Sequence, residues 1–280
     1  MLRKLTVITA TLVAFAGTTV FGQAKGPLAQ QPNIITQEGV GDTFLFPVAG
    51  NVEGANGTHF RSEVTLANYK GQDQEILVEF LEEGATVPYT AQRVTLEAGK
   101  FYFWDDFVGT MLQRTGKLGA IVIRAVISGT TVTDGSAQIN GYSRIWTPQA
   151  NGPGTSSISL PAVPEADLGA TGNGTASASI LGVRQDTQYR TNIGIVNLAP
   201  VDRTFNVTIR GTVPMPAPLT LSVTVPARSM DQFAVPEGSF GSLSITITPT
   251  SSGQWSAYAA SVDNQSGDGW VSRAIYPVRP

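Results

Sequence analysis

An internal repeat is the feature of this sequence that most limits how the chain can fold. Residues 60–104 align without gaps on residues 189–233, at a constant offset of 129 positions. Few identities survive, but in both copies apolar residues recur at every second position through three successive segments. Period-2 alternation is typical of strands with one buried face. The repeat therefore predicts two similar β-rich units in tandem.

The alternation also predicts individual strands. In residues 60–68, Val64 and Leu66 lie on one face of an extended chain, whereas Glu63 and Thr65 lie on the other. This pattern favours a half-buried strand. Further strands are predicted at residues 119–123, 137–146, 241–245 and 255–262.

Together these patterns predict an all-β fold of two tandem antiparallel β-sandwich modules. Many short strands separated by Gly- and Pro-rich turns are typical of sandwiches rather than of a parallel α/β sheet. The one helix predicted is short, residues 105–112, with Asp105 as its N-cap. We expect module one at residues 43–163 and module two, with its linker, at residues 164–280. Pro- and Gly-rich residues 161–175 are the predicted connection.

The beginning of the chain has the layout of a secretory signal peptide. Two positive charges in Met1–Lys4 precede an apolar run at residues 5–16, and the small residues Gly22 and Ala24 fit a cleavage site after Ala24. The apolar run is shorter than the about 20 residues that a membrane-spanning helix needs, which favours a cleaved peptide over an anchor. We expect residues 1–24 to be removed on export from a bacterial-type cell. The remaining chain is predicted to be secreted, extracellular or on the cell surface, without membrane insertion.

Cysteine content and charge exclude several functions. The chain has no cysteine, which excludes disulfides, thiolate metal sites and cysteine nucleophiles. After loss of Arg3 and Lys4 it keeps 16 basic against 21 acidic residues, and no basic cluster is present. Nucleic acid is therefore not an expected partner. Because only 14% of residues are charged, the surface is predicted to consist largely of Thr, Ser, Asn, Gln and Gly, which suit exposed strands and turns.

Two recurring motifs and one closing segment resemble those of secreted bacterial tandem Ig-like β-sandwich repeat proteins of unassigned function. The first is Phe/Tyr-Arg-Ser/Thr-x-Val/Ile-x-Leu/Ile-x-Asn at residues 60–68 and 189–197, and the second is Val-Thr-Leu/Val-x-Ala at residues 94–98 and 223–227. The third is the closing segment Ser261–Asp268. The resemblance covers most of residues 44–280. It implies Ig-like modules in an extracellular protein of structural or adhesive type, and it transfers no catalytic residue.

Candidates for catalysis are few. His59 is the single histidine and no Gly-x-Ser-x-Gly elbow accompanies it, so a solvated loop histidine is expected rather than a Ser-His-Asp triad. The adjacent carboxylates Glu82–Glu83 and Asp105–Asp106 would point to opposite faces of a strand, so neither pair alone can flank a sugar as glycosidase chemistry requires. Glu82–Glu83 is interpreted as a polar hairpin end. The chain is predicted not to be an enzyme.

Asp263, Asn264 and Asp268 are the candidate metal ligands. Calcium accepts six to eight oxygen ligands and tolerates loop carbonyls. The spacing does not match an EF-hand loop, and a turn in which Asp263 and Asn264 bond to their own backbone is favoured over calcium. No other cofactor is expected.

Tyr142 and Trp146 are the candidate sugar-binding residues. They lie four positions apart on one predicted strand and so share a face. Exposed aromatic rings on that face would form a stacking platform for polysaccharide, although sandwiches also bury tryptophan routinely.

The expected function is that of a non-enzymatic extracellular structural, adhesive or assembly protein. Edge strands of sandwiches can accept a strand from another chain, which makes a second copy or another surface protein the expected partner. The polar residues 25–42 lack a strand pattern and are predicted to be an arm that could act in this way. The alternatives are a carbohydrate-binding protein that uses exposed aromatics and a secreted enzyme on a β-sandwich scaffold.

Overall fold

The computed structural model describes residues 41–54, 57–86, 91–149, 153–168, 177–213 and 217–276, all within one compact unit. The predicted signal peptide and all of the predicted arm except Gly41 and Asp42 lie outside the described residues. The described chain is all-β and its sheets are antiparallel, which confirms the predicted class.

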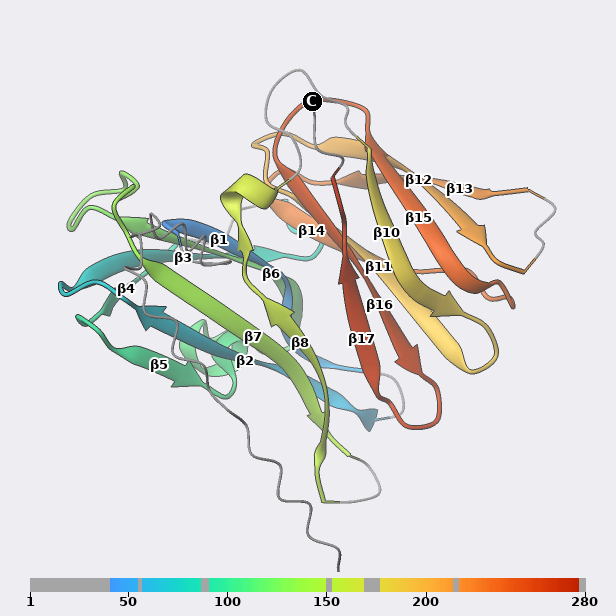
Figure 1. Cartoon of the computed structure of the whole chain (residues 1–280), viewed down its shortest axis with the longest axis horizontal. Coiled ribbons are helices and arrows are strands. Elements are labelled where there is room, and N and C mark those ends of the chain that lie inside the picture. The colour runs from blue at the N-terminus through green and yellow to red at the C-terminus, as the bar shows by residue number, and fades with distance from the viewer. Residues whose placement is uncertain are drawn as a thin grey trace, which may run out of the picture. The chain divides into compact units, whose positions relative to one another are not determined.

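The N-terminal half (residues 41–168) forms one sheet in two parts (Figure 1). Strands in the order β4-β3-β6-β1 make one part and strands in the order β5-β2-β7-β8 make the other. The parts join where β1 also pairs with β2, and β9 pairs with β1. The strands are β1 (Thr43–Glu53), β2 (His59–Asn68), β3 (Gln74–Glu82), β4 (Gln92–Leu96), β5 (Phe101–Trp104), β6 (Lys117–Val126), β7 (Ile139–Pro148), β8 (Thr155–Pro161) and β9 (Val163–Pro164).

The C-terminal half (residues 177–276) forms two four-stranded sheets, in the orders β10-β15-β12-β13 and β14-β11-β16-β17. The strands are β10 (Ala178–Gln185), β11 (Tyr189–Asn197), β12 (Arg203–Gly211), β13 (Leu219–Val225), β14 (Ser229–Ala234), β15 (Gly241–Pro249), β16 (Trp255–Asp263) and β17 (Gly269–Arg273).

The sequence repeat corresponds to a repeat of strand pairing. The order β4-β3-β6-β1 in the first half matches β13-β12-β15-β10 in the second, and β5-β2-β7-β8 matches β14-β11-β16-β17. Strands β3 and β12 begin and end at positions that differ by 129. The strands predicted from alternation are confirmed as β2, β6, β7, β15 and β16.

Each half has its own apolar core. In the first half Leu66 of β2 and Phe80 of β3 belong to one cluster of buried side chains. In the second half the equivalent residues, Ile195 of β11 and Ile209 of β12, belong to another. In both halves the two residues come from the two different sheet parts, an arrangement consistent with a β-sandwich.

A third apolar cluster joins the halves. Leu45, Leu81 and Ala120 on the outer face of β1, β3 and β6 pack with Val196 and Met230 of β11 and β14. All five side chains are almost fully buried. Burial of apolar surface between the halves therefore stabilises their contact.

Hydrogen bonds at this interface cover the free edge of β14. The N–H of Gly84 donates to the carbonyl of Met230 at 3.0 Å, and the N–H of Gln232 donates to Glu83 Oε1 at 3.2 Å. Ser229 Oγ donates to the carbonyl of Glu82 at 2.6 Å. The loop that follows β3 thus occupies main-chain groups that an edge strand would otherwise leave open.

The predicted helix at residues 105–112 is one turn, and its predicted cap is wrong. The turn spans Phe107–Met111, and Asp106 is the N-cap because its side chain accepts a hydrogen bond from the N–H of Gly109 at 2.9 Å. Asp105 instead uses its main-chain carbonyl, which accepts from Trp146 Nε1.

The first residues of the predicted linker are strand rather than connection. β8 extends to Pro161, and Val163–Pro164 pairs with Phe44 and Leu45 of β1. A short 3₁₀ turn follows at Glu165–Asp167. Residues 169–176 lie outside the described residues, so the module boundary stays a prediction.

Candidate binding surfaces

The outer face of β5, β2 and β7 carries exposed aromatic side chains. Phe101 is 75% exposed, Phe103 is 57% exposed and Tyr142 is 42% exposed. Thr65 of β2 is the register partner of both Phe103 and Tyr142, so these two aromatic residues flank it in one row across the sheet. We call Phe101, Phe103 and Tyr142 the aromatic face.

Alternation along β5 explains why two of its four aromatic residues face outward. Tyr102 and Trp104 stack on each other with ring centroids 5.9 Å apart and pack against the core of the first half. Trp104 also meets Phe107 edge to face at 5.1 Å. Because neighbouring residues of a strand point to opposite sides, Phe101 and Phe103 are directed away from that core.

Tyr142 and Trp146 share a face of β7, as predicted, but their surroundings differ. The Arg61 guanidinium lies over the Trp146 ring at 5.3 Å, and Trp146 Nε1 donates to the carbonyl of Asp105 at 3.0 Å. Trp146 is partly buried, whereas Tyr142 is exposed. Of the two candidates, Tyr142 is therefore the one whose ring is exposed to solvent.

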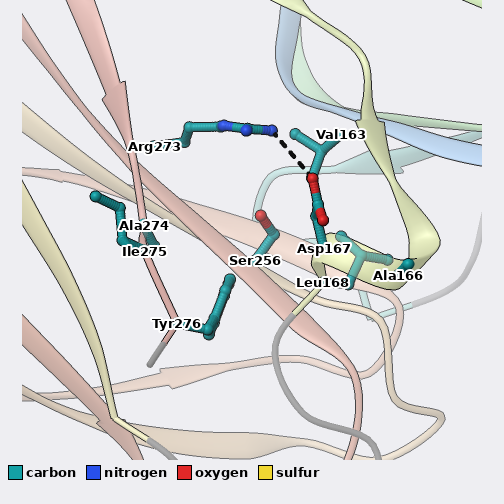
Figure 2. Close-up of a pocket in the computed structure, with 9 residues that line it drawn as sticks. All are labelled: Val163, Ala166, Asp167, Leu168, Ser256, Arg273, Ala274, Ile275 and Tyr276. Atoms are coloured by element: carbon teal, nitrogen blue, oxygen red, sulfur yellow. Dashed lines mark ion pairs between the residues drawn. The ribbon is translucent and has the colours of Figure 1, made fainter. Parts of the chain in front are cut away.

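Two cavities meet at Asp167 and Arg273, which line both of them. One has a volume of about 370 Å³ and is also lined by Ser256 and Tyr276. The other has a volume of about 280 Å³ and includes Tyr142 in its wall. Figure 2 shows the side chains of Arg273 and Asp167 extended toward each other beside the first cavity.

The Asp167–Arg273 ion pair is loose. Arg273 Nη1 and Asp167 Oδ2 are 3.8 Å apart, and the two side chains are 49% and 56% exposed. Exposed pairs of this kind contribute little to stability, about 0–1 kcal/mol. A guanidinium with five N–H donors and a carboxylate that accepts are well suited to bind the hydroxyl or carboxyl groups of a ligand.

The segment 263–268 forms a turn held by its own backbone. Asp263 Oδ1 accepts hydrogen bonds from the N–H groups of residues 265–266 at 2.7 and 2.9 Å. Asn264 Oδ1 accepts from Arg190, and the carbonyl of Asp268 accepts from the N–H of Asp263. The favoured turn interpretation agrees with the bonds of Asp263 but not with those of Asn264, which reaches Arg190 and the carbonyl of Thr187. Calcium at Asp263, Asn264 and Asp268 stays the less favoured alternative. Within the described ranges, no group of three or more His, Asp or Glu side chains is arranged to hold a metal ion.

The expectation of a solvated loop histidine at position 59 is wrong. His59 opens β2, with Nδ1 2.6 Å from Glu53 Oε1 and Nε2 3.2 Å from Asn51 Oδ1. Asn51 in turn donates to Asp106 Oδ2 at 2.6 Å. The ring is therefore held by a carboxylate and an amide, and these partners supply no nucleophilic hydroxyl.

Residues at the interface between the halves were missed by sequence reasoning. Glu83, interpreted as a polar hairpin end, reaches Gln232 of the second half. Arg228 forms an ion pair with Glu79 of the first half and adopts φ of 51°. Its equivalent at the offset of 129 is Gly99, with φ of 64°. In the repeat alignment, Arg228 stands where the first copy has the turn residue Gly99. This mismatch is a sequence signal that could have marked Arg228 as an interface residue.

A scan against protein-family models and a search of curated proteins both find no match for this chain. Among the described residues, no helix is long and apolar enough to cross a membrane.

Proposed function

We propose that this is a non-enzymatic extracellular protein of structural, adhesive or assembly type, built from two tandem Ig-like modules. The aromatic face is the observation that carries the proposal. Phe101, Phe103 and Tyr142 present large apolar rings on an outer sheet face rather than in a core. Exposed aromatic surface of this kind is typical of interaction sites.

The contact between the halves supports the same proposal. Apolar side chains, the Glu79–Arg228 ion pair and the hydrogen bonds of the Glu82–Gly84 segment all join them. A large apolar interface restricts relative motion of two modules. A stiff pair suits a protein that transmits load or spaces other surfaces.

The signal-peptide layout of residues 1–24 supports an extracellular place of action. Fractionation of the producing cell tests this, followed by N-terminal sequencing of the recovered protein. We expect the protein outside the cytoplasm, beginning at residue 25. A cytoplasmic protein that retains Met1 would overturn the extracellular assignment.

Assembly is tested by sedimentation and negative-stain imaging of the purified protein over a range of concentrations. We expect oligomers, or attachment of the protein to isolated cell surfaces. A variant that lacks residues 25–42 tests the arm mechanism, because arm-mediated assembly predicts loss of the oligomers. A protein that is monomeric at every concentration and binds no cell-surface preparation would contradict the proposed function.

Carbohydrate binding is the second candidate function, and one observation favours it. Tyr142 belongs to the aromatic face and also lines the cavity that contains Asp167 and Arg273. Sugar binding commonly combines a ring that stacks on the pyranose with charged groups that bond its hydroxyls. This combination occurs here within one stretch of surface.

A glycan array that contains neutral and uronic-acid polysaccharides tests this candidate. Tyr142→Ala and Arg273→Ala should each abolish a genuine signal, while Arg210→Ala, an exposed arginine on β12, serves as the matched control. Binding that survives both site variants would count against the cavity, and an array without signal would count against carbohydrate.

A further inference from the structure

The two halves contain equivalent edge strands in different situations. In the second half β14 pairs with β11, with Met230 opposite Val196 and Gln232 opposite Gly194. The outward carbonyl of Met230 and the outward N–H of Gln232 are then bound by the loop that follows β3. The edge of β14 is therefore closed by the first half of the same chain.

In the first half the corresponding strand is β5. Phe101 and Phe103 align with Met230 and Gln232 at the offset of 129, and their register partners Ala67 and Thr65 align with Val196 and Gly194. The carbonyl of Phe101 and the N–H of Phe103 consequently point away from β2, as their equivalents point away from β11. Within the described part of the chain, β2 is the one strand that pairs with β5.

The outward side chains also differ, since the one on β14 is covered and its equivalent on β5 is exposed. Met230 is fully buried against the first half, whereas its equivalent Phe101 is three-quarters exposed. An edge that combines open main-chain groups with exposed aromatic rings is a template for pairing with another strand. Among the described residues, the β5 edge thus lacks both kinds of contact that β14 has.

Two described sheet faces that could correspond to the β14 docking surface do not fit the β5 edge. The face that receives β14, with Leu81 and Ala120, is already covered by the second half. The equivalent face of the second half carries polar residues, among them Asn206 and Arg210, which are exposed. The N–H of Val213, which aligns with Gly84, already donates to the carbonyl of Phe240 at 3.1 Å. The β5 edge and the aromatic face beside it are instead both accessible to a second copy of this chain.

We propose that β5 pairs with β5 of a second copy of this chain, antiparallel and across a two-fold axis at Tyr102. Phe101 then lies opposite Phe103 of the second copy, and each such pair exchanges two main-chain hydrogen bonds. Directly opposed residues of antiparallel strands share a face, so four phenylalanine rings come together on one side of the joined sheet. Self-pairing of one patch is the form that two-fold interfaces take.

This inference deepens the proposed assembly function, on which it rests, by naming the partner and the strand. Sedimentation analysis of the purified protein tests it. We expect a concentration-dependent dimer. The double variant Phe101→Lys, Phe103→Lys places charges on the edge and should raise the dimer dissociation constant at least about tenfold, because aromatic residues dominate such interfaces.

A second variant separates main-chain pairing from ring packing. Phe103→Pro removes the outward N–H, and proline is tolerated at an edge position whose N–H faces solvent. Phe103→Ala keeps that N–H and removes the ring. We expect Phe103→Pro to dimerise more weakly than Phe103→Ala. The exposed Val201→Lys is the matched control for added charge and should dimerise like the parent protein.

The results of these experiments separate the β5 pairing from the proposed assembly function. Circular dichroism verifies that each variant is folded. Dimers that persist unchanged in the folded lysine and proline variants would overturn the β5 pairing and leave the assembly function standing. A parent protein that is monomeric at every concentration and binds no cell surface would overturn both. In the expected dimer, hydrogen exchange of the Phe103 amide slows as the protein concentration rises.

Discussion

Asn68 and Asn197, which are 129 positions apart, make the same four hydrogen bonds in the two halves. Each side-chain amide donates to three main-chain carbonyls, and each Oδ1 accepts from one main-chain N–H. Every partner of Asn197 lies 129 positions after the matching partner of Asn68. For Asn68 the partners are the carbonyls of Gln72, Leu96 and Glu97 and the N–H of Lys70.

Replacing either asparagine should destabilise the protein strongly. Both side chains are buried, so Asn68→Ala or Asn197→Ala removes the donor to the carbonyl of the buried Leu96 or Val225 and to two part-buried carbonyls. We expect each change to lower the free energy of unfolding by about 2–3 kcal/mol, measured by urea denaturation. Asn206→Ala, at an exposed position of β12, should change it by less than about 0.5 kcal/mol. Equal effects at all three positions would contradict the assigned role.

Arg228 combines a left-handed backbone with an ion pair to Glu79, and two substitutions separate these effects. Arg228→Gly and Arg228→Ala both remove the pair, but only glycine adopts positive φ without a steric cost. We expect the alanine variant to be less stable than the glycine variant by about 1 kcal/mol in thermal unfolding. Gly99→Ala, at the equivalent turn, should be destabilised by a similar amount. Equal stability of the two Arg228 variants would show that the turn tolerates a Cβ.

The contact made by Glu83 should depend on pH. Burial raises the pKa of Glu83, although the hydrogen bond from the Gln232 N–H opposes this and the nearby Asp231 adds to it. A raised pKa in the folded state means that the contribution of Glu83 is fully present below the ordinary glutamate pKa and is lost as pH rises through the folded-state value. We expect Glu83→Gln to remove this decline in a series of unfolding curves from acid to neutral pH. The exposed Glu97→Gln is the control, and a profile that Glu83→Gln leaves unchanged would contradict the prediction.

Calcium should have little effect on stability at the turn 263–268. The N–H groups of Ser266 and Gln265 lower the pKa of Asp263 and occupy its Oδ1, which a cation would otherwise use. We expect the melting temperature to be the same in calcium and in chelator. A saturable rise with calcium that Asp263→Asn abolishes would establish the alternative site.

The two candidate sugar-binding residues should differ in their effect on stability. Trp146→Ala removes the contacts of its ring with Arg61 and the carbonyl of Asp105, so a loss of about 1–2 kcal/mol is expected. Tyr142→Ala, at an exposed ring, should change the unfolding free energy by less than about 0.5 kcal/mol. Calorimetry measures both. Comparable losses would mean that Tyr142 serves the fold rather than a ligand.

Sequence alternation predicted the strands well where only one face is apolar. In β2, Val64 and Leu66 alternate with polar residues, and the structure buries both of them. The same rule does not apply to β5, because Phe101–Trp104 is aromatic at all four positions and alternation cannot select the buried pair. The repeat does not resolve this either, since outward Phe103 aligns with the polar Gln232 but inward Tyr102 aligns with the charged Asp231.

The interface between the halves could not be predicted from the pattern of either half alone. Glu83 is a polar residue after a strand, which is typical of a hairpin end, and only the docked second half makes it a hydrogen-bond acceptor for Gln232. The same holds for His59, whose partners Glu53 and Asn51 become neighbours only when β1 and β2 pair. Such contacts depend on tertiary structure and leave no local periodicity.

The closed edge of β14 limits how many copies of this chain can associate through edges of this kind. Of the two equivalent edges, docking of the halves closes β14 and leaves β5 open, so through these edges the chain has a functionality of one. A molecule with one such open edge forms dimers and does not grow further, whereas a filament requires two open edges on each molecule. Association through β5 would therefore be self-limiting, and any longer array of this protein would have to be built through a different surface.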